Sequence, residues 1–326
     1  MNHVQGAICL VTGGAGFVGS AIVDQLLDAG AAEVRVLDNF VRGSRSNLAT
    51  ACEKGKVNVI DGDICDPVLV DHLLEQVDYV FHQAALRITR CAEAPREAVA
   101  VLIDGTLNVL ESAVRHRVKK IVAASSASVY GEPSYLPIDE THPFNNRTMY
   151  GAGKIACEQM LRAYYTTSGL PYVAFRYFNV YGPRMDMVGV YTEVLIRWLE
   201  AIEAGKPPLI FGDGSQSMDF VFVDDVARAN LLAVQSEVSD QVFNVGTGIQ
   251  TSLKELCELL LYLTGSSLQP EYRDARTVAN VQSRRAAVEK AEQKLGFKAT
   301  VHLEEGLRKL IRWRELVKPV LVAEIA

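Results

Sequence analysis

The chain has 326 residues, of which 33 are lysine or arginine and 39 are aspartate or glutamate, so its formal net charge is −6. Such an acidic chain lacks the positive charge that binding to nucleic acid or to an anionic membrane surface requires. The hydrophobic fraction of 49% and the charged fraction of 22% are typical of a globular enzyme, and no apolar run is long enough to span a bilayer. We therefore expect a soluble, cytoplasmic protein with neither a nucleic-acid nor a membrane partner.

Strand-like and helix-like runs alternate through the first half of the chain, as in a parallel sheet covered by helices on both faces. After residue 182 the elements become shorter, apart from two amphipathic helices that we expect at 253–264 and 303–317. We place a large domain at 1–178 and a smaller C-terminal α/β lobe at 179–326, and leave open whether later segments return to the large sheet. The expected strands of the large domain are 7–12, 33–38, 57–61, 79–83, 120–125 and 172–178, and its helices are 20–29, 67–76, 99–116 and 150–168.

A glycine-rich turn joins the first strand to the first helix and reads Val-Thr-Gly-Gly-Ala-Gly-Phe-Val-Gly over residues 11–19. Gly13 permits a tight turn, and Gly16 lets backbone N–H groups approach a pyrophosphate at the start of a helix. A strand, a glycine turn and a helix in this order predict a dinucleotide site in a doubly wound, Rossmann-type sheet. We expect Phe17 and Val18, in the first turn of the helix, to contact the same cofactor.

Asp38 ends the second strand, about 20 residues beyond the glycine turn, where an acidic side chain binds the ribose hydroxyls of the cofactor. A carboxylate also repels a ribose phosphate, so Asp38 favours NAD over NADP, although the nearby Arg42 weakens that inference. The alternative is that Asp38 only caps the turn through Asn39 and Phe40. We include Asn39 and Arg42 with Asp38 among the predicted cofactor-binding residues.

Two further strand ends are expected beside the cofactor. Asp63 and Ile64 follow the third strand and could hold the adenine ring by one polar and one apolar contact, and the small residues Ala84 and Ala85 follow the fourth. For His82, at the end of the fourth strand, we favour a hydrogen-bonded structural role over catalysis. The six cysteines are dispersed, with no Cys-x-x-Cys pair and no histidine cluster, so we expect reduced thiols and no metal site.

Tyr150 and Lys154 mark the reaction centre, because positions i and i+4 at the start of a helix share one face. A free phenol has a pKa of about 10 and is a poor base at neutral pH. A lysine ammonium one turn away, together with the positive charge of a nicotinamide, favours the phenolate. Ser126 ends the fifth strand, at the edge of the sheet where ligands bind, and could hold the same substrate oxygen.

The chain resembles the extended short-chain dehydrogenase/reductase family, and within it the UDP-hexose and UDP-N-acetylhexosamine 4-epimerases. The resemblance is carried by four motifs in the family's order, which are residues 13–19, Ser-Ala-Ser-Val-Tyr-Gly at 126–131, Tyr-x-x-x-Lys at 150–154, and Arg-Tyr-Phe-Asn-Val-Tyr-Gly-Pro-Arg at 176–184. It implies that Tyr150 deprotonates the C4 hydroxyl of a UDP-sugar while NAD+ takes the C4 hydride, and that the hydride returns to the other face of the sugar.

The same resemblance assigns further contacts and an oligomeric state. Tyr177 is expected at the cofactor, Asn179 at the diphosphate of the substrate, and Phe211 near its nucleotide. Dehydratases of the family carry an acidic pair directly after the catalytic hydroxyl, and decarboxylases a glutamate at the second of those positions. Ala127 and Ser128 stand there in this chain. A homodimer is expected through the helices predicted at 99–116 and 150–168.

Other positions depart from the family and leave the substrate open. Arg87 and Arg90 replace smaller or apolar residues, and Arg90 with Arg184 resembles the arginines that hold a sugar carboxylate in uronic-acid 4-epimerases. We therefore keep a UDP-uronic acid, another nucleotide sugar, a dehydratase or reductase reaction, and a non-catalytic nucleotide-binding protein as alternatives. Met218 replaces a nucleotide-side arginine and leaves the identity of the nucleotide diphosphate open, and Leu102 replaces an asparagine, so that the cofactor loop must be braced differently. Arg284-Arg285 stands in the gate that separates hexose from acetylhexosamine enzymes, and it matches neither type.

Overall fold

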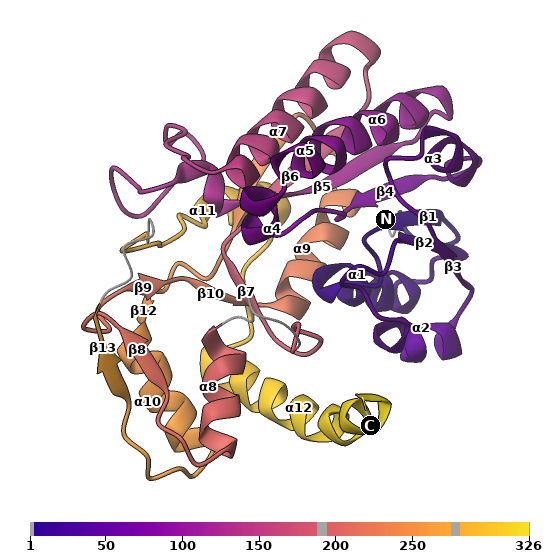
Figure 1. Ribbon diagram of the computed structural model, residues 1–326. Coiled ribbons are helices and arrows are strands. Elements are labelled where there is room, and N and C mark those ends of the chain that lie inside the picture. The colour runs from indigo at the N-terminus through magenta and orange to yellow at the C-terminus, as the bar shows by residue number, and fades with distance from the viewer. Residues whose placement is uncertain (1–2, 188–193, 275–280, 326) are drawn as a thin grey trace.

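The core of the fold is a seven-stranded sheet in which every neighbouring pair of strands is parallel, in the order β11-β6-β5-β4-β1-β2-β3. The computed structural model describes residues 3–187, 194–274 and 281–325 (Figure 1). The strand order reverses between β1 and β4, which is where ligands bind in doubly wound sheets. The predicted fold class is therefore confirmed. The strands are β1 (Ile8–Thr12), β2 (Glu33–Asp38), β3 (Val57–Asp61), β4 (Tyr79–His82), β5 (Lys120–Ser126), β6 (Tyr172–Tyr177) and β11 (Gln241–Val245).

Helices cover both faces of this sheet (Figure 1). On the lower face in that view, α1 packs against α9 and α2, whereas α6 packs against α3 and α7 on the upper face. Both β11 and α9 come from the chain after residue 178, so later segments do return to the large domain. The helices of the two faces are α1 (Phe17–Asp28), α2 (Ala49–Lys54), α3 (Pro67–Leu73), α4 (Ile88–Glu93), α5 (Pro95–Val99), α6 (Gly105–Arg115), α7 (Met149–Ser168) and α9 (Val223–Gln235).

The helix predicted at 99–116 is not one regular α-helix. A π-helical turn over Ala100–Asp104, in which Gly105 N donates to Ala100 O, separates α5 from α6. Gly105 packs directly on Ile64, where an added Cβ would lie 2.7 Å from Ile64 Cδ1. Gly105, which has no Cβ, follows the π-helical turn and packs closely on Ile64. The apolar periodicity of the sequence did not predict this turn.

Within the described residues, the second half of the chain adds three two-stranded sheets and four further helices, most of which lie at the lower left and bottom of Figure 1. One apolar core extends from Ile22 of α1 through Val226 of α9 to Trp198, Leu260 and Leu310, all at most 2% exposed. The two halves of the chain therefore share their main core. The elements are β7 (Asn179–Tyr181) with β10 (Phe220–Phe222), β8 (Leu209–Phe211) with β13 (Glu271–Arg273), β9 (Ser217–Met218) with β12 (Thr251–Ser252), and helices α8 (Val194–Glu203), α10 (Leu253–Leu263), α11 (Glu289–Leu295) and α12 (Leu303–Ile325).

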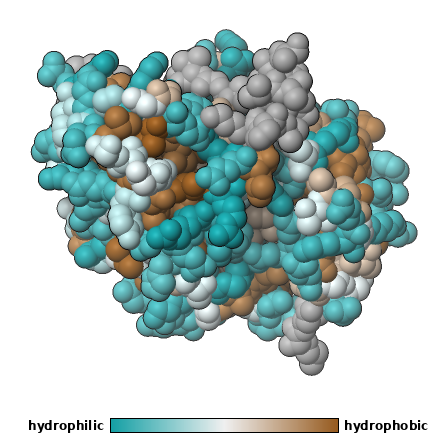
Figure 2. Space-filling model, turned by 90° about the horizontal axis from the view of Figure 1, so that it is seen from below, coloured by the Kyte–Doolittle hydropathy of each residue, from teal (hydrophilic) through white to brown (hydrophobic). Residues whose placement is uncertain are grey.

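The surface carries both apolar and hydrophilic side chains. On the face seen in Figure 2, apolar side chains form separate patches among hydrophilic ones. Within the described part of the chain, no helix is long and apolar enough to cross a membrane, and no group of three metal-ligating side chains occurs. All six cysteines are free thiols, and Cys52 is the exposed one.

Glu33, at the start of β2, links the stability of the fold to pH. Its carboxylate accepts hydrogen bonds from Arg35 Nε at 2.8 Å, from Asn58 Nδ2 at 3.3 Å and from Lys56 Nζ. The hydrogen bonds from Arg35 and Lys56 lower the pKa of Glu33 from its ordinary 4.5 to about 2. Because the folded pKa lies below the unfolded one, this stabilisation is complete above pH 4.5 and is lost as the pH falls towards 2.

We predict that Glu33→Gln lowers the melting temperature at neutral pH. Between pH 4.5 and about pH 2, the melting temperature of the variant should decrease less steeply than that of the native protein. Thermal melts over this range measure the effect. The matched control is Glu53→Gln, at an exposed position of α2, which should keep the slope of the native protein. Parallel stability curves for Glu33→Gln and the native protein would contradict the assignment.

Candidate active site

The glycine turn between β1 and α1 forms one wall of a cavity of about 610 Å³. Gly13 has φ = +67°, and a Cβ there would lie 2.8 Å from the backbone nitrogen of Ala84. Gly16 is the N-cap of α1, and no side chain caps this helix. The N–H groups at the start of α1 are therefore available to an anion, as a bound pyrophosphate requires.

Asp38 lies at the end of β2 and lines the same cavity. Its Oδ2 accepts a hydrogen bond from Ala15 N and its Oδ1 one from Phe40 N, each at 2.9 Å. The hydrogen bond from Phe40 N shows that Asp38 does cap the turn through Asn39 and Phe40. The carboxylate also lines the cavity, so capping is not its only contact. Burial raises the pKa of Asp38 against the effect of these two N–H donors.

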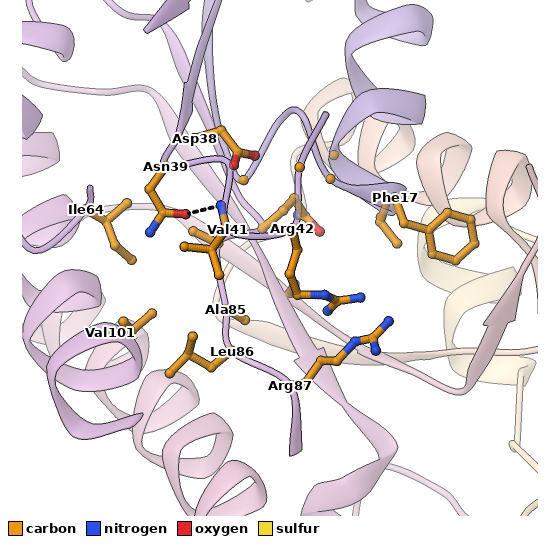
Figure 3. Close-up of a pocket in the computed structure, with 18 of the residues that line it drawn as sticks. Phe17, Asp38, Asn39, Val41, Arg42, Ile64, Ala85, Leu86, Arg87 and Val101 are labelled. Atoms are coloured by element: carbon orange, nitrogen blue, oxygen red, sulfur yellow. Dashed lines mark hydrogen bonds between the residues drawn. The ribbon is translucent and has the colours of Figure 1, made fainter. Parts of the chain in front are cut away.

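Apolar side chains surround another part of the cavity. In Figure 3, Ile64, Val101, Leu86 and Val41 lie around one space. Asp63, next to Ile64, accepts hydrogen bonds from Cys65 N at 2.9 Å and from Asn39 Nδ2 at 2.8 Å. Burial opposes ionisation of this carboxyl, but the two bonds outweigh it and hold the pKa of Asp63 below its usual range.

The arginines predicted to bind ligand are all ion-paired with carboxylates. Arg42 and Arg87, whose guanidinium groups lie next to each other in Figure 3, contact Asp186 Oδ2 at 3.3 and 3.0 Å. Arg184 contacts Asp24 at 2.7 Å and has φ = +69°. These three arginines line the cavity, whereas Arg90 lies outside its lining and contacts Glu97 at 2.5 Å.

Tyr150 and Lys154 reach the cavity from the first turns of α7. Thr148 caps this helix by accepting a hydrogen bond from Gly151 N at 3.1 Å. Lys154 is 3% exposed and donates from Nζ to Ala124 O at 2.7 Å. Its Nζ lies 5.8 Å from the centre of the Tyr150 ring, so the two side chains share one face of α7.

Ser126 is not among the residues that line the cavity, although Ser125 and Ser128 are. Its Oγ donates to Ser128 Oγ at 3.1 Å and accepts from Ser128 N at 3.1 Å, because Ser126 caps a short 3₁₀ turn. The two hydroxyls form one hydrogen-bonded pair, and the member at the cavity wall is Ser128. Which of the two serines reaches the cavity depends on the geometry of the 3₁₀ turn that follows β5.

A buried ion pair fixes α7 against the sheet. Arg176 of β6 donates from Nε and Nη2 to the two carboxylate oxygens of Glu158 at 2.9 and 2.7 Å. The side chains are only 5% and 2% exposed. Ser125 of β5 also donates to this carboxylate. Glu158 lies one helical turn beyond Lys154, so the ion pair holds the face of α7 that carries Lys154 on β5 and β6.

His82 has the structural role that its position at a strand end favoured. Its Nδ1 and Nε2 are hydrogen-bonded to Thr12 Oγ1 at 2.8 Å and Thr106 Oγ1 at 3.0 Å. Burial, and the nearby charge of Lys154, lower its pKa to about 3, so the ring is neutral at physiological pH. Tyr177 lines the cavity, and its hydroxyl donates to Gln83 Oε1 at 3.1 Å.

The predicted site residues therefore divide into two groups. Four of them lie outside the cavity lining, namely Ser126, Arg90, Asn179 in β7 and Phe211 in β8. Asp186, Leu86 and Val101 line the cavity but were not predicted, since no local pattern marks them and their contacts come from distant segments. The predicted residues in the lining are Gly13, Gly16, Phe17, Val18, Asp38, Asn39, Arg42, Asp63, Ile64, Ala84, Ala85, Arg87, Tyr150, Lys154, Tyr177 and Arg184.

The chain is similar to known proteins over most of its length. The NAD dependent epimerase/dehydratase family matches residues 9–246. The chain belongs to this family. The UDP-glucose 4-epimerase of Mycolicibacterium smegmatis is 38% identical over 307 residues, which are 93% of this chain and 97% of that protein. A UDP-N-acetyl-alpha-D-glucosaminuronate decarboxylase of Bacillus cytotoxicus is 32% identical over 322 residues, covering 94% and 97%.

Solved structures agree with this membership. The UDP-N-acetylglucosamine 4-epimerase of Methanobrevibacter ruminantium, in complex with UDP-N-acetylmuramic acid, has a TM-score of 0.91 and 33% identity and covers 96% of this chain and 99% of its own. The UDP-glucose 4-epimerase of Bifidobacterium longum, in complex with NAD+ and UDP, has a TM-score of 0.86 and 28% identity and covers 95% and 98%. NAD is the cofactor of this epimerase/dehydratase-family enzyme, and the turn at Gly13 and the uncapped α1 fit it.

We predict that Gly13→Ala abolishes retention of NAD, because an added Cβ meets the backbone of residue 84. The matched control is Gly296→Ala, where φ is +65° and no atom lies within 4 Å. Both variants incur the strain of a non-glycine residue at positive φ, about 1–2 kcal/mol. The NAD content of each purified protein, measured after denaturation, separates the two effects. Equal NAD contents would refute the close-approach role of Gly13.

Proposed function

We propose that this enzyme is a UDP-sugar 4-epimerase, acting on UDP-glucose and UDP-galactose or on their N-acetylated forms. The enzyme modifies nucleotide sugars, as its relatives include both 4-epimerases and decarboxylases. The observation that carries the choice of 4-epimerisation is the position of Tyr150 and Lys154 on one wall of the cavity. The end of β5 lies beside them, and Ala127 and Ser128, which follow it, provide no second acid or base.

The chain's own residues account for the proton transfer in this proposal. Tyr150, as phenolate, takes the proton of the C4 hydroxyl and later returns it to the same oxygen. Lys154 lies beside Tyr150 and is itself held by its hydrogen bond to Ala124 O. NAD+, when bound, supplies the hydride acceptor for C4. We assign Ser126 its predicted role at the sugar oxygen, and its hydrogen-bond partner Ser128 lies at the cavity wall.

Residues 127 and 128 favour epimerisation over elimination or decarboxylation. Ala127 is 2% exposed and apolar, and Ser128 carries only a hydroxyl. A dehydratase must remove a proton at C5 and protonate a leaving hydroxyl, which needs a positioned acid and base. Return of the hydride at C4 needs neither group. We therefore favour the 4-epimerase reaction over that of the decarboxylase relatives.

The contacts to the nucleotide remain proposals. Asn179 and Phe211 lie in β7 and β8, beyond the lining of the NAD cavity, and we assign them to the diphosphate and the nucleotide of the substrate. Arg87 and Arg184 line the cavity and are paired with carboxylates. Arg90 is paired with Glu97, so neither it nor Arg184 provides an unpaired cation for a sugar carboxylate.

We also propose a homodimer formed through α5, α6 and α7. Apolar side chains on these helices are exposed, with Val99 at 43%, Met149 at 40% and Tyr165 at 37%. Burying them against a second copy would remove apolar surface from water. We predict a mass of twice 35.7 kDa in analytical ultracentrifugation, and a monomer at micromolar concentration would refute the dimer.

Tyr150→Phe is predicted to lower kcat by about 10³-fold, because removing a positioned base costs about 10²- to 10⁴-fold. NAD content should stay at the native level. The control is Tyr165→Phe, at an exposed tyrosine of the same helix, which should keep native turnover. Incubation with UDP-glucose and UDP-galactose, followed by NMR of the anomeric signals, measures both rates. Native turnover in Tyr150→Phe would rule out the mechanism.

A further inference from the structure

The segment that follows β7 forms part of the wall of the NAD cavity. Three of its residues, Arg184, Met185 and Asp186, line this cavity. The segment starts from a fixed point, because Gly182 packs on α9, where an added Cβ would lie 2.7 Å from a side-chain carbon of the helix. Met185 is 4% exposed and belongs to the main apolar core. Residues 182–186 therefore have a defined path along the cavity.

An ion pair joins this segment to α1. Arg184 Nη1 lies 2.7 Å from Asp24 Oδ2, and the two side chains are only 20% and 21% exposed. Arg184 also has φ = +69°, a backbone conformation that is unfavourable for any residue with a Cβ. The contact with α1 thus holds the segment in a conformation that its own backbone disfavours.

A second set of ion pairs joins the same segment to the loops after β2 and β4. Asp186 Oδ2 lies 3.3 Å from Arg42 Nη2 and 3.0 Å from Arg87 Nη2. Figure 3 shows the two guanidinium groups next to each other, on the side of the cavity where Phe17 lies and away from Ile64. Two like charges this close repel each other, and the carboxylate that they share offsets the repulsion. Asp186 therefore connects three loops at one point.

The two sets of contacts link different walls of the cavity. The start of α1, the loops after β2 and β4 and the 182–186 segment all line it. The segment is attached to α1 through Arg184 and to the two loops through Asp186, two residues further on. These walls can therefore move apart only if the ion pairs break.

We propose that the 182–186 segment locks NAD into the enzyme, with Asp186 as its attachment to Arg42 and Arg87 and Arg184 as its attachment to α1. The ion pairs resist the separation of the walls between which the cofactor enters and leaves. A 4-epimerase must return the same hydride to its sugar, so its cofactor has to stay bound between the two transfers. The inference goes beyond that reaction, because it requires only that the enzyme binds NAD.

The ion pairs are contacts within the chain, so breaking them should speed entry and release of NAD alike. The dissociation constant should then change less than the release rate. Asp186→Asn should raise the release rate by about 3- to 30-fold, the range for the loss of two partly exposed ion pairs. Salt screens such pairs, so added salt should speed release from the native enzyme and have a smaller effect on this variant.

The experiment uses the purified enzyme with its bound NAD. Equilibrium dialysis against labelled NAD gives the dissociation constant, and a chase with unlabelled NAD gives the release rate. Asp186→Asn and Asp24→Asn each remove one attachment, and both should raise the release rate. Asp71→Asn is the matched control and should keep the native rates, because Asp71 also contacts two basic side chains, Arg115 and His116, but lies outside the cavity lining.

Thermal melts establish that each variant is folded, and Asp186→Glu, which keeps the charge, should release NAD more slowly than Asp186→Asn. Native release rates in Asp186→Asn or in Asp24→Asn would overturn the proposal. So would slower release in Asp186→Asn, which would make Asp186 a competitor of the pyrophosphate for the two arginines. An equal rise of the release rate and the dissociation constant would also overturn it. No sugar takes part in these measurements, so their outcome is independent of the test with Tyr150→Phe.

Discussion

The buried ion pair between Arg176 and Glu158 is the interaction on which the site depends. It joins β6 to α7 where both side chains are almost fully excluded from water, and breaking such a pair on one side costs about 3–5 kcal/mol. Since Lys154 lies one turn before Glu158, the same contact sets the distance of Lys154 from Ala124 and from the Tyr150 ring. The placement of Tyr150 and Lys154 and the packing of the sheet are thus one feature of the fold.

The opposite side of the cavity depends on close backbone approach. Gly13 packs against the backbone of Ala84, which follows β4, without room for a Cβ. Asp38 fixes the glycine turn by accepting a hydrogen bond from Ala15 N. These contacts place the uncapped start of α1 at the reversal point of the sheet. This wall of the cavity is therefore built from backbone and a short side chain, while Tyr150 and Lys154 come from α7.

The arginines at the cavity wall are held by carboxylates of other segments. Arg42 and Arg87 both contact Asp186, and Arg184 contacts Asp24. Ion pairs at these distances orient both side chains, so the contacts fix the positions of the three guanidinium groups along the wall.

The sequence alone determined the parallel α/β sheet, the glycine turn and the shared face of Tyr150 and Lys154, because each depends on the spacing of nearby residues. Only the tertiary structure decided that β11 pairs with β6 and that Ser128 rather than Ser126 lines the cavity wall. It also decided that Arg90 forms an ion pair with Glu97. Those outcomes depend on short-range geometry at turns and on contacts between distant segments. Hydrogen bonds and charge pairs of this kind leave no periodic pattern in a single sequence.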